Sequence, residues 1–599
     1  MLASTAGSVA FLISLFLVMT AFAKFFARRG GGLQGAMIGL SLVPSFISLT
    51  TYASFALFSY SLPGRLLPIV IPVIIAAGMV AFDRDRGGRP VFSMSGLRGS
   101  PLILALAVPV VIFVIAIVAV AVIRDQANHD ISIYLFEAAD LVRLMVNGTS
   151  TLLAWASYQH PIAYPHSLAF STYLSWGFLF EPSPGFGHDA LPKLLVGFGH
   201  LAVLAAVASL FARSRPRWWM LVAVGMAMLD SVWSYQISAM SRDSFYTGPA
   251  VALLTLLLRL KDGRADWPRQ WWIALSLALW GVLFGHSLGI VLASGVAGGA
   301  GVVLLLRFGL RILTIRQLWL VGAAIVAMAG SSVVTYFGGD HGTRGFAFPY
   351  YVDPIHHALF AQKQAFLSVP SIWALGGYLA ATNGIGWLLA AILAAGLLLV
   401  VGVSVVYRRP FVSGTWVGLL VALVACLLLI AFMPVKLDGI SLRGAFVSNL
   451  RYGFPIGILA LALIAETARV GLRTLPVTVW SFRARHSALA LLALIVGVAA
   501  VWNAAHYVPR SNRRFAVEEH ELCERLRQSG VTKFFFDNDS SIYRCSANAV
   551  YAFSPNGSRI MGAEGDHRSP PNSTSNTSMP LCSNTRSRSG GPEPASMVI

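Results

Sequence analysis

The chain has 599 residues, of which 56% are hydrophobic and 12% are charged, and its mean hydropathy is +0.70. These values exclude a soluble globular protein, and apolar runs of about 20 residues, each long enough to cross a bilayer as a helix, recur along most of the sequence. The net charge of +19 does not indicate a nucleic-acid partner, because the basic residues lie in short clusters between apolar runs, as the positive-inside rule predicts.

The N-terminal region, residues 1–123, is expected to cross the membrane several times. Its first apolar run, Val9 to Ala23, has no basic segment before it, so we interpret it as a span rather than a cleaved signal. The positive-inside rule places the cluster of Lys24, Arg28 and Arg29 in the cytoplasm and the N-terminus outside. Further spans are expected at 33–58, 66–82 and 102–123.

Residues 124–192 follow these spans and form the first large extracytoplasmic loop of the predicted topology. Asp130 lies at the N-terminus of a helix in NHDISIYLFEAADLV, where the helix dipole favours the ionised carboxylate that a general base needs. A simple N-cap role for Asp130 is the alternative. The helix is expected to lie at the membrane surface on one apolar face, formed by Ile133, Phe136, Ala139 and Leu141.

The same loop contains an aromatic and proline-rich segment, YQHPIAYPH, from Tyr158 to His166. Such residues are common at the membrane interface, so a structural role is one interpretation. Their position after Asp130 favours the other interpretation, in which His160, together with His129, supports the catalytic carboxylate.

Residues 193–504 form the predicted transmembrane core, which brings the total to about fourteen spans. Most Lys and Arg residues of the short loops then fall on the cytoplasmic side. The two spans that meet near His286 and Gly289 have an alternative interpretation as one long broken helix. The core spans are expected near 193–212, 218–237, 246–260, 271–287, 288–306, 318–336, 384–407, 413–433, 452–468 and 487–504.

The outer loop 238–245 contains the sequence SRD, with Arg242 and Asp243 at the mouth of the following span. Asp243 could hold a metal, position an acceptor hydroxyl or pair with Arg242. Asp230 and His286 fall inside apolar runs, where ionisable groups are costly. Both are therefore functional candidates, with a hydrogen-bonded packing role as the alternative.

The outer loop 337–383 supplies Arg344 among several acidic, histidine and tyrosine residues. We expect this loop to line or cover the acceptor site. The adjacent His356 and His357 do not indicate a metal, because neighbouring side chains on a helix diverge by about 100° and rarely bind one ion together.

The outer loop 434–451 ends in NLRYGFP, which leads into a span that begins near Tyr452. Arg443 and Arg451 lie just outside this span, where a guanidinium at headgroup depth can clamp a phosphate or pyrophosphate. Snorkelling to ordinary lipid phosphate is the alternative. For Arg443 the two interpretations stay open, whereas the position of Arg451 favours a role in binding a substrate phosphate.

The C-terminal region is expected to contain a small extracytoplasmic α/β domain, residues 505–555, with a helix over EEHELCERLRQSG and a strand over VTKFFFD. Residues 556–599 are rich in Ser, Asn, Pro and Arg and are expected to be disordered. The few cysteines indicate neither a disulfide framework nor a CxxC metal site, and only Cys523 and Cys545 could pair.

Together these features resemble the GT-C superfamily, the polytopic glycosyltransferases that use lipid-phosphate-linked sugars, such as protein O-mannosyltransferases and lipid A aminoarabinose transferases. The similarity lies in HD at His129 and Asp130, the following HPIAYP, the later SRD and the late NLRYGFP. It implies that Asp130 is the catalytic base, that Asp243 belongs to a second acidic motif and that Arg451 binds the donor phosphate. The sequence departs from the family pattern because three extra spans precede the acidic loop and the C-terminal piece is small.

The sequence therefore predicts an all-α polytopic membrane protein of the inner (plasma) membrane, with a glycosyltransferase site on its extracytoplasmic side. The resemblance implies a polyprenyl-phosphate sugar donor of undecaprenyl or dolichyl type, an inverting transfer and a glycan, lipid or protein acceptor. No cofactor is specified, and a divalent cation stays open. The alternatives are a flippase or carrier of lipid-linked saccharides and a polysaccharide ligase or polymerase. The candidate residues are Asp130 and Asp243 for catalysis and His129, His160, Arg242, Arg344, Arg443, Arg451 and Tyr452 for substrate binding.

Overall fold

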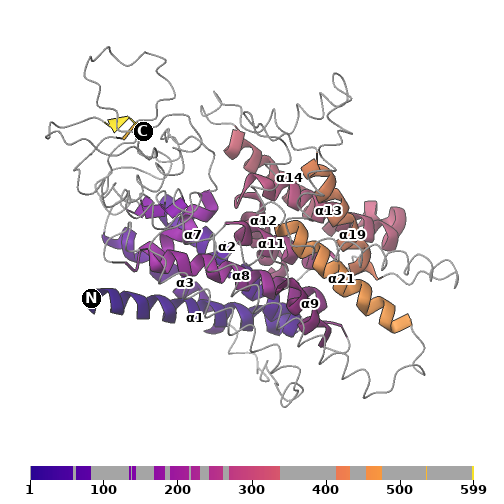
Figure 1. Ribbon diagram of the computed structural model, residues 1–599, viewed down its shortest axis with the longest axis horizontal. Helices are drawn as coiled ribbons and strands as arrows, with labels where there is room; N and C mark the ends of the chain where they lie inside the picture. The colour runs from indigo at the N-terminus through magenta and orange to yellow at the C-terminus, as the bar shows by residue number, and fades with distance from the viewer. Residues whose placement is uncertain are drawn as a thin grey trace, which may run out of the picture.

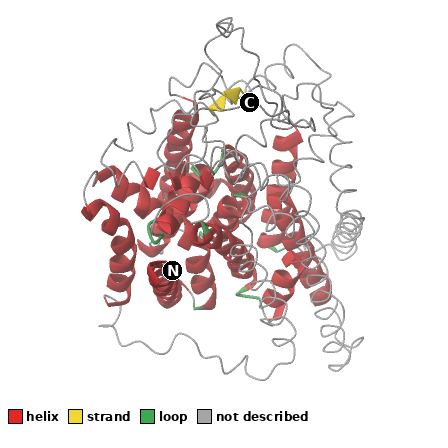
Figure 2. Ribbon diagram, turned by 60° about the vertical axis from the view of Figure 1, so that its left-hand side comes forward, coloured by secondary structure: helices red, strands yellow, loops and turns green. Residues whose placement is uncertain are grey.

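The described part of the chain is a bundle of helices (Figure 2). The computed structural model describes residues 2–30, 32–57, 62–81, 134–135, 138–139, 141–142, 168–181, 189–214, 218–228, 242–260, 269–337, 413–431, 454–474, 534–535 and 597–598. Its helices are α1 (Leu2–Gly30), α2 (Leu33–Leu57), α3 (Leu62–Ala81), α7 (Leu168–Phe178), α8 (Ala190–Phe211), α9 (Trp218–Met228), α11 (Asp243–Leu257), α12 (Arg269–Leu283), α13 (Ser287–Phe308), η3 (Gly309–Thr314), α14 (Arg316–Phe337), α19 (Gly414–Ala431) and α21 (Phe454–Thr474).

Several of these helices are suited to a membrane. Four segments of the described part are long and apolar enough to cross one, namely Thr5–Ala27, Leu33–Phe55, Ala190–Phe211 and Gly289–Ile312. A helix satisfies its own backbone polar groups, which lipid cannot do. On α1, Leu12, Ile13 and Phe16 are exposed, as expected for side chains that face lipid. The described part is therefore an all-helical membrane protein apart from two very short strands.

Helix α2 packs against α1, α7, α8 and α12 and so holds a central place in the bundle (Figure 1). A hydroxyl in its middle joins two of these neighbours. Ser48 Oγ donates a hydrogen bond to the backbone oxygen of Ala169 on α7 at 2.6 Å and accepts one from Trp280 Nε1 on α12 at 3.0 Å. Such bonds between buried helices contribute about 1 kcal/mol each, and here they fix the start of α7 against the middle of α2.

Helices α12 and α13 are two separate helices that run in opposite directions, so the alternative of one long broken helix is excluded. At the start of α12, the ring centroid of Trp271 lies 4.7 Å from the guanidinium carbon of Arg259, just past the end of α11. Near the end of α13, Val303 lies beside Gly418 on α19, which also contacts Leu258 at the end of α11. The start of α12 and the end of α13 therefore both lie near the end of α11. The turn that connects α12 to α13 lies near the start of α11.

Small residues allow α13 and α19 to approach closely. A Cβ atom added to Gly299 would lie 2.3 Å from the backbone oxygen of Gly418, and one added to Gly295 would lie 2.5 Å from Cys426 Sγ. Glycine and alanine are the usual means of close helix packing in membranes, because lipid gives no hydrophobic drive for association. The pairing also shows that α13 and α19 are antiparallel.

Arginine side chains gather at one end of the bundle, which we call the basic end. Arg213 follows α8, Arg259 follows α11, and Arg269 begins α12. Gln34 at the start of α2 connects the end of α8 to Arg259. Its Nε2 donates a hydrogen bond to the backbone oxygen of Ser209 at 2.8 Å, and its Oε1 accepts one from Arg259. We call the opposite end, where α11 begins, the site end.

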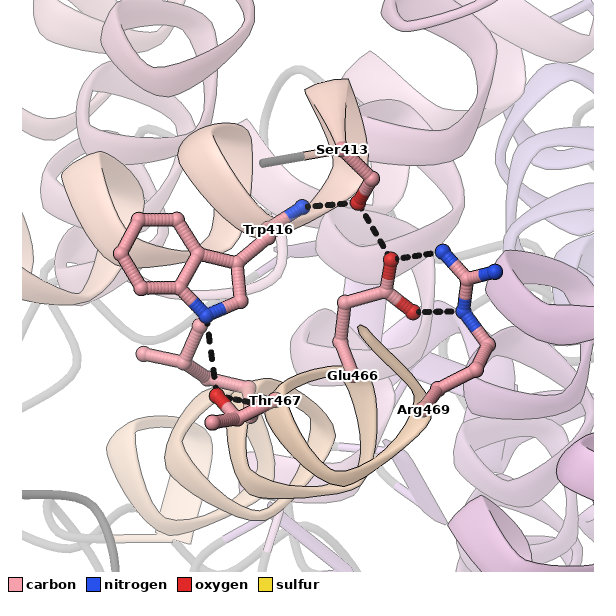
Figure 3. A network of polar contacts seen from close by, with 6 residues as sticks. Ser413, Trp416, Glu466, Thr467 and Arg469 are labelled. Carbon is pink, nitrogen blue, oxygen red and sulfur yellow. Dashed lines mark hydrogen bonds and ion pairs between the residues drawn. The ribbon is translucent and has the colours of Figure 1, made fainter. Parts of the chain in front are cut away.

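A polar network joins α19 to α21 at the basic end (Figure 3). Ser413 caps α19, because its Oγ accepts a hydrogen bond from the backbone nitrogen of Trp416 at 3.1 Å and donates one to Glu466. The buried Glu466 also accepts a bond from Arg469 Nε at 2.6 Å. Trp416 Nε1 donates to Thr467 Oγ1 at 2.9 Å. The carboxylate of Glu466 is thus compensated by a cation and a hydroxyl from two helices.

Four of the predicted spans, those at 9–23, 33–58, 193–212 and 288–306, correspond to helices of the described part that are long and apolar enough to cross a membrane. The span predicted at 193–212 corresponds to Ala190–Phe211, and the one predicted at 318–336 corresponds to Arg316–Phe337. The predicted spans 102–123, 384–407 and 487–504 lie outside the described residues. The total of about fourteen spans therefore stays a prediction.

The predicted loop 124–192 contains helices that pack into the bundle. The described residues of 134–142 are helical and buried, and α7 is buried between α2 and α8. Ala139 and Leu141 of the predicted apolar face are among them, but they lie against protein rather than at a membrane surface. Ile133 and Phe136 lie outside the described residues.

Little of the C-terminal region is described. Strand β1 (Phe534–Phe535) lies within the predicted strand VTKFFFD and pairs in parallel with β2 (Met597–Val598). The other residues of 505–599 lie outside the described part, so the predicted small domain and disordered tail stay predictions.

Candidate functional site

The first residue of α11 is a buried carboxylate. Asp243 has no solvent exposure, and its Oδ1 accepts a hydrogen bond of 2.6 Å from Tyr246 Oη. The first turn of a helix favours a negative charge because its backbone N–H groups are free to face it. Tyr246 reaches the carboxylate because residues three apart lie on the same face of a helix. Helix α11 therefore orients its own acidic residue.

The neighbouring Arg242 directs its guanidinium towards two rings from other parts of the chain. One nitrogen donates a hydrogen bond to His286 Nε2 in the turn between α12 and α13. The guanidinium carbon also lies 4.7 Å from the ring centroid of Tyr134, as in a cation–π contact. An arginine side chain has only donors, so His286 Nε2 must accept, and the histidine proton lies on Nδ1. The imidazole is therefore neutral beside the arginine.

His286 is also fixed by a second ring. It stacks on Tyr246, with centroids 5.4 Å apart and an angle of 20° between the planes. Tyr246 thus contacts His286 with its ring and Asp243 with its hydroxyl. Both the histidine and the tyrosine are buried. Arg242, Asp243, Tyr246 and His286 form one connected cluster, which we call the α11 cluster.

Aromatic side chains from α7 and α11 support this cluster. The Tyr134 ring packs edge-on against Phe170, with centroids 5.2 Å apart, and Phe170 packs against Phe245 at 5.6 Å. Tyr173, one turn further along α7, lies 5.2 Å from Phe245 and donates its hydroxyl to the backbone oxygen of Leu195 at 2.8 Å. Because α7 is held against α2, these rings keep Tyr134 in position under Arg242.

Two other helices, α8 and α21, also lie near the start of α11. A Cβ added to Gly199 on α8 would lie 2.9 Å from Ser244 Oγ, so the two backbones are very close. The next residue, His200, has its ring 5.8 Å from the ring of Phe454, the first residue of α21. About 13 Å of helix, at 1.5 Å per residue, separates Gly199 from the first residue of α8. The α11 cluster therefore lies deeper in the bundle than the first residue of α8.

The α11 cluster includes three residues that the sequence singled out, namely Arg242, Asp243 and His286. Asp243 accepts a hydrogen bond from Tyr246, and Arg242 contacts His286 and Tyr134. The other predicted residues lie outside the described part of the chain, and these are His129, Asp130, His160, Asp230, Arg344, Arg443, Arg451 and Tyr452.

Sequence analysis did not single out Tyr134 or Tyr246. A signal for Tyr246 was present, because a phenol three residues after a helix-starting aspartate can reach its carboxylate. Tyr134 carried only a weak signal, since its partner Arg242 is distant in sequence and the contact depends on how α7 packs.

A metal centre is not apparent in the part that the structure describes, where no group of three His, Cys, Asp or Glu side chains could hold an ion. The cation of the α11 cluster is the guanidinium of Arg242. A fixed guanidinium suits an anion, because its planar fork of donors matches the oxygens of a carboxylate or a phosphate.

A second group of buried charges lies between α7 and α8, at the site end. Lys193 Nζ lies 2.8 Å from Asp189 Oδ1, and both side chains are buried. Glu181 Oε1 accepts a hydrogen bond of 3.4 Å from the backbone nitrogen of Leu191. Burial raises the pKa of Glu181 above its usual value of 4.5, the bond from Leu191 opposes this rise, and the charge of Asp189 adds to it.

The α11 cluster therefore combines a buried carboxylate, an oriented guanidinium and a neutral imidazole, which is a set of groups suited to binding a polar or anionic substrate within an apolar protein. No protein-family model, no curated protein and no solved structure matches this chain.

Proposed function

We propose that this chain is an integral membrane glycosyltransferase that transfers a sugar from a polyprenyl-phosphate donor to a cell-envelope acceptor. One observation carries this proposal, the meeting of three distant segments around the start of α11. Arg242 lies against Tyr134, Ser244 lies against α8 at Gly199, and the adjacent His200 lies against Phe454. These segments contain HD, SRD and NLRYGFP, the motifs on which the resemblance to the GT-C superfamily rests.

The length of the chain supports a shared site for these motifs. Asp130 precedes Tyr134 by four residues, and Arg451 precedes Phe454 by three. An extended chain covers at most about 3.6 Å per residue, so the Cα atoms of Asp130 and Arg451 lie within about 14 Å and 11 Å of those anchors. We therefore propose that both side chains reach a substrate that is bound at the α11 cluster.

In the proposed reaction, the Asp130 carboxylate accepts the proton of an acceptor hydroxyl. The hydroxyl oxygen forms a bond to the anomeric carbon of the donor as the bond from that carbon to the phosphate oxygen breaks. The electron pair leaves with the polyprenyl phosphate, and Arg242 and Arg451 stabilise its negative charge. Attack from the face opposite the phosphate inverts the anomeric configuration.

The α11 cluster supports this reaction by orienting its groups before the substrate binds. Arg242 is fixed by His286 and Tyr134, so little reorganisation is needed when charge develops on the phosphate. A neutral His286 adds no second positive charge that would repel the arginine. Asp243 is a positioning residue in this account, because its carboxylate is bonded to Tyr246, which in turn stacks on His286.

The distribution of charge supports a location in the plasma membrane with the site end outside. The basic end carries Arg213, Arg259 and Arg269, and positively charged loops favour the cytoplasmic side. The donor then reaches the α11 cluster from the outer leaflet, and the acceptor is a glycan, a lipid or a protein of the envelope.

The proposal can be tested with the full chain in proteoliposomes. Undecaprenyl-phosphate mannose and undecaprenyl-phosphate glucose serve as donors, envelope vesicles supply acceptors, and mass spectrometry measures the release of undecaprenyl phosphate. Replacing Arg242 by Gln should slow release by about 100-fold. Arg213→Gln, which removes an exposed arginine at the basic end, should leave it unchanged. Movement of intact donor across the bilayer without release would contradict the proposal and favour a carrier.

A further inference from the structure

The turn from α13 into α14 carries exposed arginine and apolar side chains side by side. Gly309 adopts a φ of 56°, which glycine tolerates, and this lets η3 follow α13 directly. Arg307 lies in the last turn of α13, Arg311 lies in η3, and Arg316 begins α14, and all three are exposed. The turn lies at the basic end, because Arg307 is close to Gly414 at the start of α19. We call it the arginine turn.

Three large apolar side chains at the arginine turn are mostly exposed. Leu310 is 81% exposed, Leu306 is 72% exposed and Trp319 is 62% exposed. Ile315, by contrast, is buried and anchors the turn to the bundle. Exposed leucine and tryptophan beside arginine at a helix end are typical of a surface that sits at the boundary between acyl chains and headgroups.

The charge of the arginine turn is uncompensated within its own segment. The sequence contains no Asp or Glu between Asp266 and Asp340. Nor does any of the three arginines form an ion pair with another residue of the described part. The nearby buried carboxylate, Glu466, is already bound by Arg469. Within the described part of the chain, no carboxylate therefore neutralises these three guanidinium groups.

We propose that the arginine turn is a binding site for the headgroup of an anionic phospholipid in the leaflet at the basic end. The guanidinium groups bind the headgroup phosphate and neutralise the net negative charge of the lipid, while Leu306, Leu310 and Trp319 lie along its acyl chains. The site is remote from the α11 cluster and does not depend on the proposed transferase activity. It would hold the α13–α14 turn in place against the bilayer.

Native mass spectrometry of the purified full chain tests this site, with phosphatidylglycerol and phosphatidylcholine as probes. A variant with Arg307→Gln, Arg311→Gln and Arg316→Gln should retain phosphatidylglycerol at least about tenfold less well, since each basic group near a lipid surface contributes about a fivefold effect. The variant in which the three are replaced by Lys should keep most of the binding, because the charge is unchanged. Neither variant should alter the retention of phosphatidylcholine.

The control replaces two exposed arginines at the same end, Arg213→Gln and Arg269→Gln, and should keep the preference for phosphatidylglycerol. Equal losses in the control and the triple variant would overturn the proposal, because general positive charge would then explain the binding. Unchanged retention in the triple variant would also overturn it. If the triple variant does not fold, Arg311→Gln alone should reduce the rise in melting temperature that phosphatidylglycerol gives to the full chain, and an unchanged rise would overturn the site.

Discussion

The ring of His286 stacks on the ring of Tyr246, with the two centroids 5.4 Å apart. This contact joins the turn between α12 and α13 to the first turn of α11. Because Tyr246 also donates its hydroxyl to Asp243, and His286 also accepts from Arg242, the two rings connect the acidic and basic groups of the SRD sequence. The geometry of each charged group therefore depends on the other.

Replacing Tyr246 by Phe should weaken both stability and transfer. The ring would still stack on His286, but the fully buried carboxylate of Asp243 would lose a hydrogen-bond donor at 2.6 Å. The loss of one partner from a buried polar group costs about 1–3 kcal/mol. Thermal melting of the purified chain and the release of undecaprenyl phosphate measure the two effects.

The matched control is Tyr173→Phe. This hydroxyl donates to a backbone oxygen, that of Leu195, at the same kind of buried site. The Tyr173→Phe variant should lose a similar amount of stability. After correction for the folded fraction, it should release undecaprenyl phosphate at the rate of the parent chain. Equal losses of release in the two variants would show that Tyr246 has only a structural role.

The candidate site could be predicted only in part. Arg242 and Asp243 were recognisable because two charged residues stand together at the start of an apolar run. His286 was recognisable as an ionisable residue in an apolar run, but its contact with Arg242 was not, since it is 44 residues away in sequence and meets Arg242 through the turn between α12 and α13. A sequence pattern shows that a buried histidine needs a partner but does not show which helix supplies it.

Replacing Gly299 by Ala should destabilise the pair of α13 and α19. The added methyl group would lie 2.3 Å from the backbone oxygen of Gly418, so the helices must separate. Overpacking of this kind costs about 1–3 kcal/mol. Gly298→Ala in the same helix has nothing within 4 Å and should be neutral, or stabilising by up to about 1 kcal/mol. A melting temperature that falls equally in both would contradict this packing.

Replacing Glu181 by Gln should remove a penalty that grows as the pH rises. Burial raises the pKa of Glu181 in the folded chain above 4.5, so the folded state favours the protonated carboxyl, and the associated stability is lost as the pH increases through the folded pKa. Gln keeps the oxygen that accepts from Leu191 but has no charge. The melting temperature of the variant relative to the parent should therefore increase from about pH 4 to about pH 7. A difference that does not change with pH would contradict the burial of this charge.

Replacing Glu466 by Gln should destabilise the contact between α19 and α21. Arg469 would keep its charge in a buried position without the carboxylate that binds it through Nε at 2.6 Å. Removal of one partner of a buried ion pair costs about 3–5 kcal/mol. Ser413→Ala, which removes only the cap of α19, should cost about 1 kcal/mol.

The double variant Glu466→Leu with Arg469→Met supplies the comparison for this pair. It leaves no buried charge, so its melting temperature should recover most of the loss. If the double variant is as unstable as the sum of its single variants, the two residues do not form the buried pair seen here.

The fold was more predictable than the site. Helix α8 agrees with the span predicted at 193–212 to within a few residues, because the length of an apolar run fixes the length of a membrane helix. The sequence did not predict that α7 is buried between α2 and α8. Its short apolar run is bounded by polar residues, and such a run has the same pattern in a loop helix and in a core helix.

The central claim, that one transferase site lies around the start of α11, is tested most directly by Asp130→Asn in the proteoliposome assay. We expect this variant to insert, to be as abundant as the parent chain and to bind undecaprenyl-phosphate mannose. Its release of undecaprenyl phosphate should be abolished, because Asn cannot accept the proton of the acceptor hydroxyl. Release at the parent rate by a normally folded Asp130→Asn variant would contradict the account.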